Sequence, residues 1–246
     1  IRYIFAVYYG ETCNRQVKYS DNQSVAFDVR LVPDRDYQFV VWADVVAQND
    51  KVDGVYANED GLHYNTTDLH NITLKQTWVA MDETRDAFTC SETRRFERSN
   101  AITLELKRPF AKLRVVTTDM VELGYLGVNP THATVDYATP YRASFNALEG
   151  TAAAAVDSNV KSHGVFEIAA YGDNTNASKV LFTDYLFAEQ DVVKFTLSVY
   201  EDAAKTKPIK SNFFNTDIAV NRNYLTTISG NILTDGNNAK VDVQDA

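Results

Sequence analysis

Apolar and polar residues alternate with a period of two along much of the chain. Successive side chains of a β-strand point to opposite faces, so this alternation predicts strands that bury one face and expose the other. One further run, residues 37–43, is apolar on nearly both faces and predicts a central strand that is covered on both sides. The alternating runs are residues 25–31, 102–107, 111–116 and 194–199.

Segments rich in Asn, Asp, Gly and Pro separate the predicted strands. These residue types supply local side-chain hydrogen bonds and positive φ angles, both of which chain reversals need. Short strands between frequent turns are typical of β-sandwiches. The turn segments are residues 20–24, 33–36, 48–61, 172–178, 202–208 and 235–238.

Helical patterns are scarce. Asp82 is suited to be an N-cap, with Glu83 in the first turn, so residues 82–90 are predicted to form one short helix. The alanine-rich run at residues 150–156 predicts a second one, although it has no clear amphipathic face.

The length of 246 residues exceeds the usual size of a single domain. The strand pattern stops near residue 116 and begins again near residue 133, which places the expected boundary within residues 117–127. We therefore predict an all-β chain of two β-sandwich domains, residues 1–120 and 121–246.

The composition excludes two classes of partner. A formal net charge of −9 leaves no broad basic surface, which argues against nucleic acid. The longest apolar stretches, such as residues 39–43 and 168–171, are far shorter than the ~20 residues of a membrane helix.

Because Ile1 already lies in a strand-like run, removal of an upstream segment such as a signal peptide is expected. Cys13 and Cys90 either pair in an oxidising compartment or stay separate.

No segment carries a catalytic motif. The chain has no Gly-x-Ser-x-Gly elbow, no phosphate-binding glycine loop, no Cys-x-x-Cys and no His-Glu-x-x-His. We therefore predict no enzymatic activity, no catalytic residues and no cofactor.

Histidines and carboxylates offer two metal hypotheses. His63 and His70, with Asp60 and Asp68, could gather around a transition metal, but the more common role of such residues is that of exposed loop side chains. The acidic residues between positions 44 and 60 could bind calcium, or form a solvated loop, since they lack EF-hand spacing. These acidic residues are Asp44, Asp50, Asp53, Glu59 and Asp60, and the remaining histidines are His132 and His163.

Aromatic residues raise the question of sugar binding, because aromatic faces stack on sugar rings. Most of them occupy alternating strand positions, where the core accounts for them. Those in or near loop-like segments, and therefore candidates for surface platforms, are Tyr8, Tyr9, Tyr56 and Tyr64.

Six longer segments, spread over nearly the whole chain, form a further pattern. They are 37–44 (YQFVVWAD), 64–69 (YNTTDL), 85–88 (RDAF), 106–113 (LKRPFAKL), 183–187 (TDYLF) and 221–234 (NRNYLTTISGNILT). In order and spacing they resemble the Bacteroides-type fimbrillin-like proteins, the type V pilins. The resemblance implies two tandem transthyretin-like sandwiches with Greek-key character, export as a lipoprotein precursor, and assembly into a fimbrium after proteolytic trimming.

The resemblance also implies how subunits join. An incomplete sandwich exposes unpaired backbone groups that a strand of a neighbouring molecule can fill. In the fimbrillin-like family C-terminal strands fill a vacancy left by an N-terminal segment, so residues 228–243 are the expected donor and residues 1–9 the expected acceptor edge. The candidate strand-exchange residues are Ile1, Tyr3, Phe5, Val7, Ile228, Ile232, Leu233, Val241 and Val243.

These expectations define a function and an alternative. The first is a fimbrial subunit or pilus-associated cell-adhesion protein, exported to the cell surface or outer membrane, whose partners are other pilin subunits and a host or bacterial surface ligand. The alternative is a stand-alone β-sandwich module that binds carbohydrate or a host ligand at the cell surface.

Overall fold

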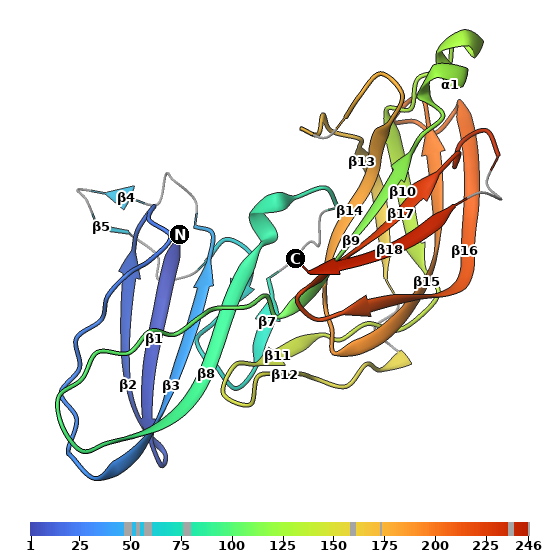
Figure 1. Cartoon of the computed structure of the whole chain (residues 1–246). Helices are drawn as coiled ribbons and strands as arrows, with labels where there is room; N and C mark the ends of the chain where they lie inside the picture. The colour runs from blue at the N-terminus through green and yellow to red at the C-terminus, as the bar shows by residue number, and fades with distance from the viewer. Residues whose placement is uncertain are drawn as a thin grey trace. The chain divides into compact units, whose positions relative to one another are not determined.

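A computed structural model describes residues 1–46, 61–75, 80–157, 161–172, 174–235 and 239–245, together with the backbone of one short strand pair. That pair is β4 (Lys51–Val52) and β5 (Val55–Tyr56). The chain is built from antiparallel-rich β-sheets, and the predicted all-β sandwich class is confirmed (Figure 1). No helix in the part of the chain that the structure describes is long and apolar enough to cross a membrane.

The chain forms two compact units, each made of segments from both halves of the sequence. Unit 1 comprises Ile1–Gln76, Thr84–Pro109 and Ala143–Ala153. Unit 2 comprises Thr77–Glu83, Phe110–Arg142 and Ala154–Ala246. That residues 1–120 and 121–246 are the two β-sandwich domains stays a prediction.

The main sheet of unit 1 has the strand order β2-β1-β3-β8, and every pair is antiparallel. Strand β3 lies between β1 and β8 and is almost entirely buried from Tyr37 to its end, which confirms the central strand predicted at residues 37–43. The strands are β1 (Arg2–Tyr9), β2 (Thr12–Tyr19), β3 (Arg35–Asp44) and β8 (Ala87–Phe96).

A second, smaller sheet covers one face of this main sheet. Its strand order is β12-β11-β7-β6. Trp42 of the main sheet contacts Tyr64 and Phe145 of the small sheet, with ring centroids 5.3 and 6.3 Å apart. The small strands are β6 (Tyr64–Asn65), β7 (Ile72–Leu74), β11 (Ser144–Asn146) and β12 (Thr151–Ala152).

Unit 2 is a sandwich of two four-stranded sheets. One has the order β14-β9-β17-β18 and the other β13-β10-β15-β16, and only β9 and β17 run parallel. Alternate residues of both sheets, such as Leu113 and Phe195, meet in one apolar core. The strands are β9 (Phe110–Thr117), β10 (His132–Tyr137), β13 (Ser162–Glu167), β14 (Lys179–Phe187), β15 (Gln190–Tyr200), β16 (Pro208–Asn221), β17 (Tyr224–Gly230) and β18 (Lys240–Asp245).

Both predicted helices are wrong. Of residues 82–90 only one 3-10 turn, η2 (Glu83–Arg85), is helical, and β8 begins at Ala87. Residues 151–152 of the alanine-rich run form strand β12, since pairing with β11 outweighs a helix that has no apolar face to bury. The α-helix α1 (Met120–Leu126) lies instead within the segment expected to be a linker.

Two of the predicted strands do not pair with a neighbouring strand. Residues 25–31 and 102–106 are extended but lack strand partners, and Figure 1 draws both as coil. Their alternation reflects one-sided burial, which needs no hydrogen-bonded neighbour. The runs at residues 111–116 and 194–199 do form strands, within β9 and β15.

Candidate strand-exchange sites

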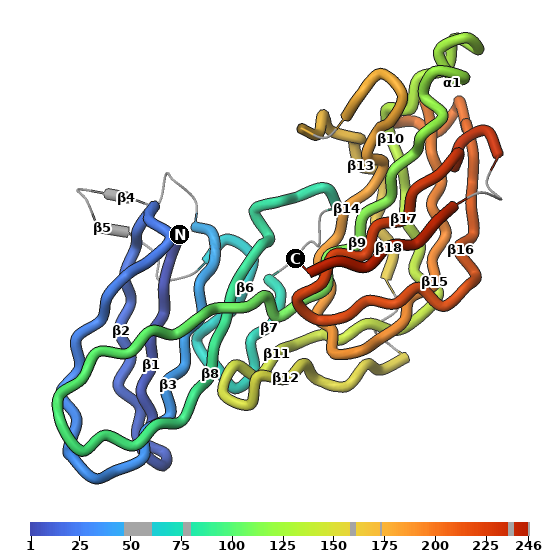
Figure 2. Tube along the Cα trace, viewed as in Figure 1, coloured from blue at the N-terminus to red at the C-terminus, as the bar shows by residue number. Residues whose placement is uncertain are grey.

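The second face of the main sheet in unit 1 is covered without a paired sheet. Two extended segments, residues 25–31 and 102–106, lie over it, and we call them the covering segments (Figure 2). Phe27 of the first stacks on Phe5 of β1, with ring centroids 4.8 Å apart. The apolar residues under the segments are Phe5, Val7, Tyr37, Phe39 and Val41, and those that cover them are Phe27, Val29, Leu31, Ile102, Leu104 and Leu106.

The backbone of the covering segments is available for pairing. Within the described part of the chain, residues 24–31 and 101–106 form no backbone-to-backbone hydrogen bond. Side chains hold the first segment instead: Gln16 Nε2 donates to the Asp28 carbonyl at 3.1 Å, and Lys18 Nζ donates to the Ala26 carbonyl at 2.6 Å. Extended backbone with unpaired N–H and C=O groups is a template for an added strand.

The expectation that residues 1–9 form a sheet edge is wrong. Strand β1 pairs with β2 on one side and with β3 on the other, so its backbone groups are already used. Of the predicted acceptor residues, Phe5 and Val7 lie beneath the covering segments. Tyr3 is buried and its hydroxyl donates to the Asn22 carbonyl, while Ile1 precedes the strand and its carbonyl accepts from the Ser20 N–H.

An ion pair without solvent contact fixes the start of β1. The Arg2 guanidinium donates from Nε and Nη2 to the two oxygens of Asp44, at 2.9 and 2.7 Å, and the two residues are 0% and 1% exposed. Burial raises the pKa of Asp44, and the hydrogen bonds from Arg2 oppose that rise. A Cβ at Gly61 would lie 2.2 Å from Asp44 Oδ2, so only glycine fits there. The buried ion pair between Arg2 and Asp44 therefore holds the start of β1 in place.

The C-terminal strand β18 has the opposite character. It lies at the edge of its sheet, pairs only with β17, and every one of its residues is exposed. Val241 and Val243 are 49% and 37% exposed. By contrast Ile228, Ile232 and Leu233 are at most 4% exposed in the core of unit 2. The structure therefore divides the predicted donor residues into an exposed pair and a buried trio.

The metal hypotheses can be compared with the structure only in part. No three His, Cys, Asp or Glu side chains come together to hold an ion among the residues that the structure describes. His63 Nε2 lies 2.7 Å from Thr84 Oγ1, and the His70 ring packs edge-on against Tyr8. Asp44 is in the buried ion pair, and the rest of the acidic loop, Asp50, Asp53, Glu59 and Asp60, lies outside the described residues.

The remaining histidines, His132 and His163, differ in burial and in hydrogen-bond partner. His163 is buried, with Nε2 2.9 Å from Asp184 Oδ2 in unit 2. His132 is half-buried, and its Nδ1 lies 2.8 Å from the Thr131 hydroxyl.

The candidate aromatic platforms differ in exposure, and of the two alternatives for the cysteines the structure shows separate thiols. Tyr9 is exposed, Tyr8 is half-buried, and Tyr64 is fully buried with its hydroxyl donating to the Arg85 carbonyl. The side chain of Tyr56 lies outside the described residues. Cys13 and Cys90 are both free thiols.

The two units thus define one class of molecule: a β-sandwich protein with unpaired backbone at the surface of unit 1 and an exposed edge strand in unit 2. The whole chain, residues 1–246, matches the family of unknown function DUF6562, and it belongs to that family. No curated protein matches the chain.

Solved structures share the fold at low sequence identity. A candidate cell adhesion protein from Bacteroides ovatus has 12% identity and a TM-score of 0.56, with 99% of this chain and 86% of that one covered. A candidate polysaccharide-binding protein from Bacteroides thetaiotaomicron has 11% identity and a TM-score of 0.54, with 100% and 89% covered. These two likenesses agree with the fold that the fimbrillin-like resemblance implies.

A third structure is less similar. The tip fimbrial protein Mfa3 from Porphyromonas gingivalis, with a C-terminal truncation, has 12% identity and a TM-score of 0.48, with 100% of this chain and 94% of that one covered.

Proposed function

We propose that this protein is a fimbrial subunit or pilus-associated adhesion protein that joins other subunits by strand complementation. In the proposed contact, β18 of one copy leaves β17 and pairs with a covering segment of the next copy. The single observation that carries this proposal is the coexistence of unpaired extended backbone in unit 1 and a fully exposed edge strand in unit 2. The name of the Bacteroides ovatus neighbour supports the adhesion role.

Burial of β18 side chains contributes a favourable term to exchange, which is set against the translational and rotational freedom lost on association. The hydrogen bonds between β18 and β17 are replaced by equivalent bonds to a covering segment, each worth about 0.5–1.5 kcal/mol net in either place. The gain comes from the side chains, because Val241 and Val243 are 49% and 37% exposed in the monomer. Burying both in a neighbour would add about 1–2 kcal/mol. The covering segment that pairs with β18 would also satisfy its backbone groups along one side.

Subunits of the same or a related kind are the partners that this contact requires. An exported protein at the cell surface would meet them there, and attachment to the outer membrane through a lipid would hold the first subunit. The contact uses backbone groups and apolar side chains, so it needs neither a catalytic residue nor a cofactor.

A disulfide that locks β18 to β17 tests the proposal. Thr227 and Asp242 are directly opposite in the antiparallel register, where Cα atoms are about 4.5–5.5 Å apart, a separation that a disulfide spans. We expect Thr227→Cys/Asp242→Cys, in a Cys13→Ser/Cys90→Ser background, to stay monomeric when oxidised and to polymerise when reduced. Assembly is followed by size-exclusion chromatography and electron microscopy, at rising concentration and after limited proteolysis.

The matched control locks a different strand pair of unit 2. Ser198 and Ser211 are opposite each other on β15 and β16, and Ser198→Cys/Ser211→Cys should assemble in both redox states. Polymerisation of the oxidised β17–β18 variant, or its absence from the reduced one under every condition, would contradict the proposal.

Carbohydrate binding is a second candidate, favoured by one cavity. A cavity of about 540 Å³ in unit 2 is lined by the hairpin ends of β14–β15 and β16–β17. Carboxylate, amide, guanidinium and phenol groups, the types that bind sugar hydroxyls, line it: Glu189, Gln190, Asn221, Arg222 and Tyr224. The name of the Bacteroides thetaiotaomicron neighbour is in keeping with it. Saturable glycan-array binding by the monomer, lost in Arg222→Ala, would establish this activity.

A further inference from the structure

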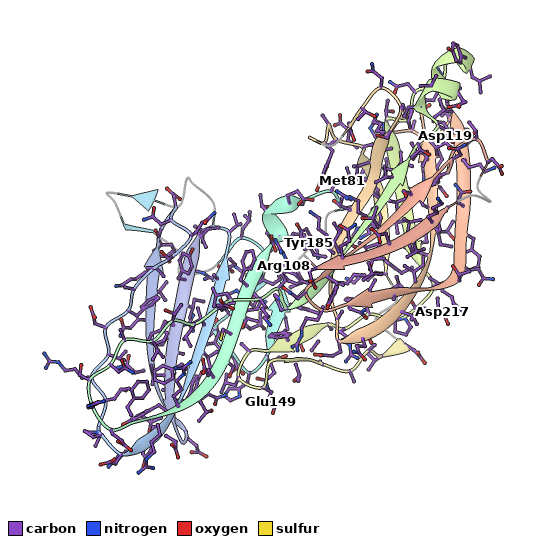
Figure 3. All side chains as sticks on the ribbon, in the orientation of Figure 1. Met81, Arg108, Asp119, Glu149, Tyr185 and Asp217 are labelled. Carbon is purple, nitrogen blue, oxygen red and sulfur yellow. The ribbon has the colours of Figure 1, made fainter. Side chains whose placement is uncertain are left out.

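Asp119 occupies the position of a helix N-cap but does not cap the helix. It directly precedes α1, and its side chain makes no hydrogen bond to the N–H groups of that helix. The residue is fully buried in unit 2, next to the core (Figure 3). A buried carboxylate at this place needs partners elsewhere in the chain.

The partners of Asp119 come from the turn that precedes the C-terminal strand. Asp119 Oδ2 accepts the backbone N–H of Leu233 at 2.9 Å, the N–H of Thr234 at 2.6 Å and the Thr234 hydroxyl at 2.8 Å. The Thr117 hydroxyl donates to Oδ1. All four contacts are donors, which an ionised carboxylate satisfies better than any neutral side chain of its size.

Further contacts attach the same turn to the body of unit 2. Asn212 Nδ2 donates to the Ile232 carbonyl at 2.8 Å, and the Thr118 hydroxyl donates to Asn231 Oδ1 at 2.8 Å. The side chains of Ile232 and Leu233 are buried in the core. Beyond this turn the exposure changes abruptly, since all of β18 is exposed.

We propose that Asp119 is a positioning residue that sets the hinge of the donor strand. It holds residues 231–234 against the core, so that the chain beyond Asp235 can separate from β17 while Ile232 and Leu233 stay buried. Without this clamp, opening of β18 would spread into the turn and expose the core. This inference rests on the proposed function, because it assigns the length of chain that a subunit can donate.

Amide hydrogen exchange of the full-length monomer, followed by NMR, tests the clamp. In the wild-type protein we expect the Leu233 and Thr234 amides to exchange at least about 100-fold more slowly than those of β18, as separate opening units do. In Asp119→Ala, which removes every acceptor, their exchange should accelerate about 100-fold and approach the rate of β18.

Two variants keep the test informative if Asp119→Ala does not fold. In Asp119→Asn the amide N–H₂ can turn to Thr117, whose hydroxyl rotates to accept it, and the remaining oxygen still receives the three other donors. We expect an intermediate acceleration of about 10-fold, because the charge that strengthens these bonds is lost. Thr118→Ala removes an exposed bond to the same turn and should change the exchange less than about 3-fold.

Two outcomes would overturn the clamp: wild-type Leu233 and Thr234 amides that exchange together with β18, or unchanged protection in the Asp119 variants. The experiment needs no polymer. A failed assembly experiment therefore leaves this result standing, and a failed exchange experiment leaves the assembly result standing.

Discussion

Breaking the buried ion pair at the start of β1 should destabilise unit 1 strongly. Asp44→Asn removes the carboxylate charge that faces the Arg2 guanidinium, which is 0% exposed. Removing one partner of a buried pair costs about 3–5 kcal/mol, because the remaining charge stays away from water. With a urea dependence of about 2 kcal/mol per molar, the unfolding midpoint should fall by about 2 M.

The assay is equilibrium unfolding in urea in a Trp78→Phe background, followed by the fluorescence of Trp42, which is fully buried in the same unit. Asp34→Asn is the matched control, since Asp34 pairs with Arg95 at 3.9 Å on the surface and Asn tolerates its positive φ of 62°. We expect its midpoint to stay at the wild-type value.

A double variant separates charge from packing. Arg2→Met with Asp44→Leu replaces both charges by apolar groups and should recover more than half of the lost stability. If the midpoint of Asp44→Asn decreases by less than about 0.5 M, as in the surface control, the ion pair does not hold the start of β1 in place and the reasoning is refuted.

Two further predictions follow from titratable groups. Burial acts to raise the pKa of Glu83, but hydrogen bonds from Lys112, Tyr171 and Tyr185 bring the pKa below its ordinary value. The stabilisation that accompanies this lowered pKa is fully present when the pH is above the ordinary carboxyl pKa. It is lost as the pH falls through the lower pKa that Glu83 has in the folded protein. The melting temperatures of wild type and Glu83→Gln should therefore differ at pH 7 and converge near pH 3; a constant difference would contradict this. Both thiols should react with a disulfide reagent in the native protein. Cys13 should react faster because it is exposed, whereas burial raises the pKa of the Cys90 thiol. A Cys13–Cys90 disulfide in a peptide map would disprove this prediction.

Period-two patterning predicted the strands well where hydrogen bonding and one-sided burial coincide. It located β9 and β15, and a run that is apolar on both faces located β3; together they predicted the sandwich class. The same pattern at residues 25–31 and 102–106 predicted strands that do not pair, because alternation reports which side chains are buried and is silent on where the backbone N–H and C=O groups bond.

The contacts that hold the start of β1 and the turn before β18 in place could not be predicted from the sequence. Arg2 and Asp44 are 42 residues apart, and Asp119 and Thr234 are 115 residues apart, so nothing local marks them as partners. Asp119 carries the local signature of an N-cap, and tertiary contacts use its carboxylate elsewhere. The division of the donor residues into the exposed Val241 and Val243 and a buried trio likewise follows from tertiary structure: β18 is an edge strand, and the turn before it packs into the core.

Hydrogen exchange of the covering segments, measured in the monomer and in the polymer, tests the central claim most directly. Residues 24–31 and 101–106 have no backbone-to-backbone hydrogen bonds in the described structure of the monomer, so their amides should exchange rapidly. If β18 of a neighbour pairs with a covering segment, alternate amides of that segment should become protected by about 100-fold or more on assembly. Amides that exchange equally fast in the polymer would contradict strand complementation at this site.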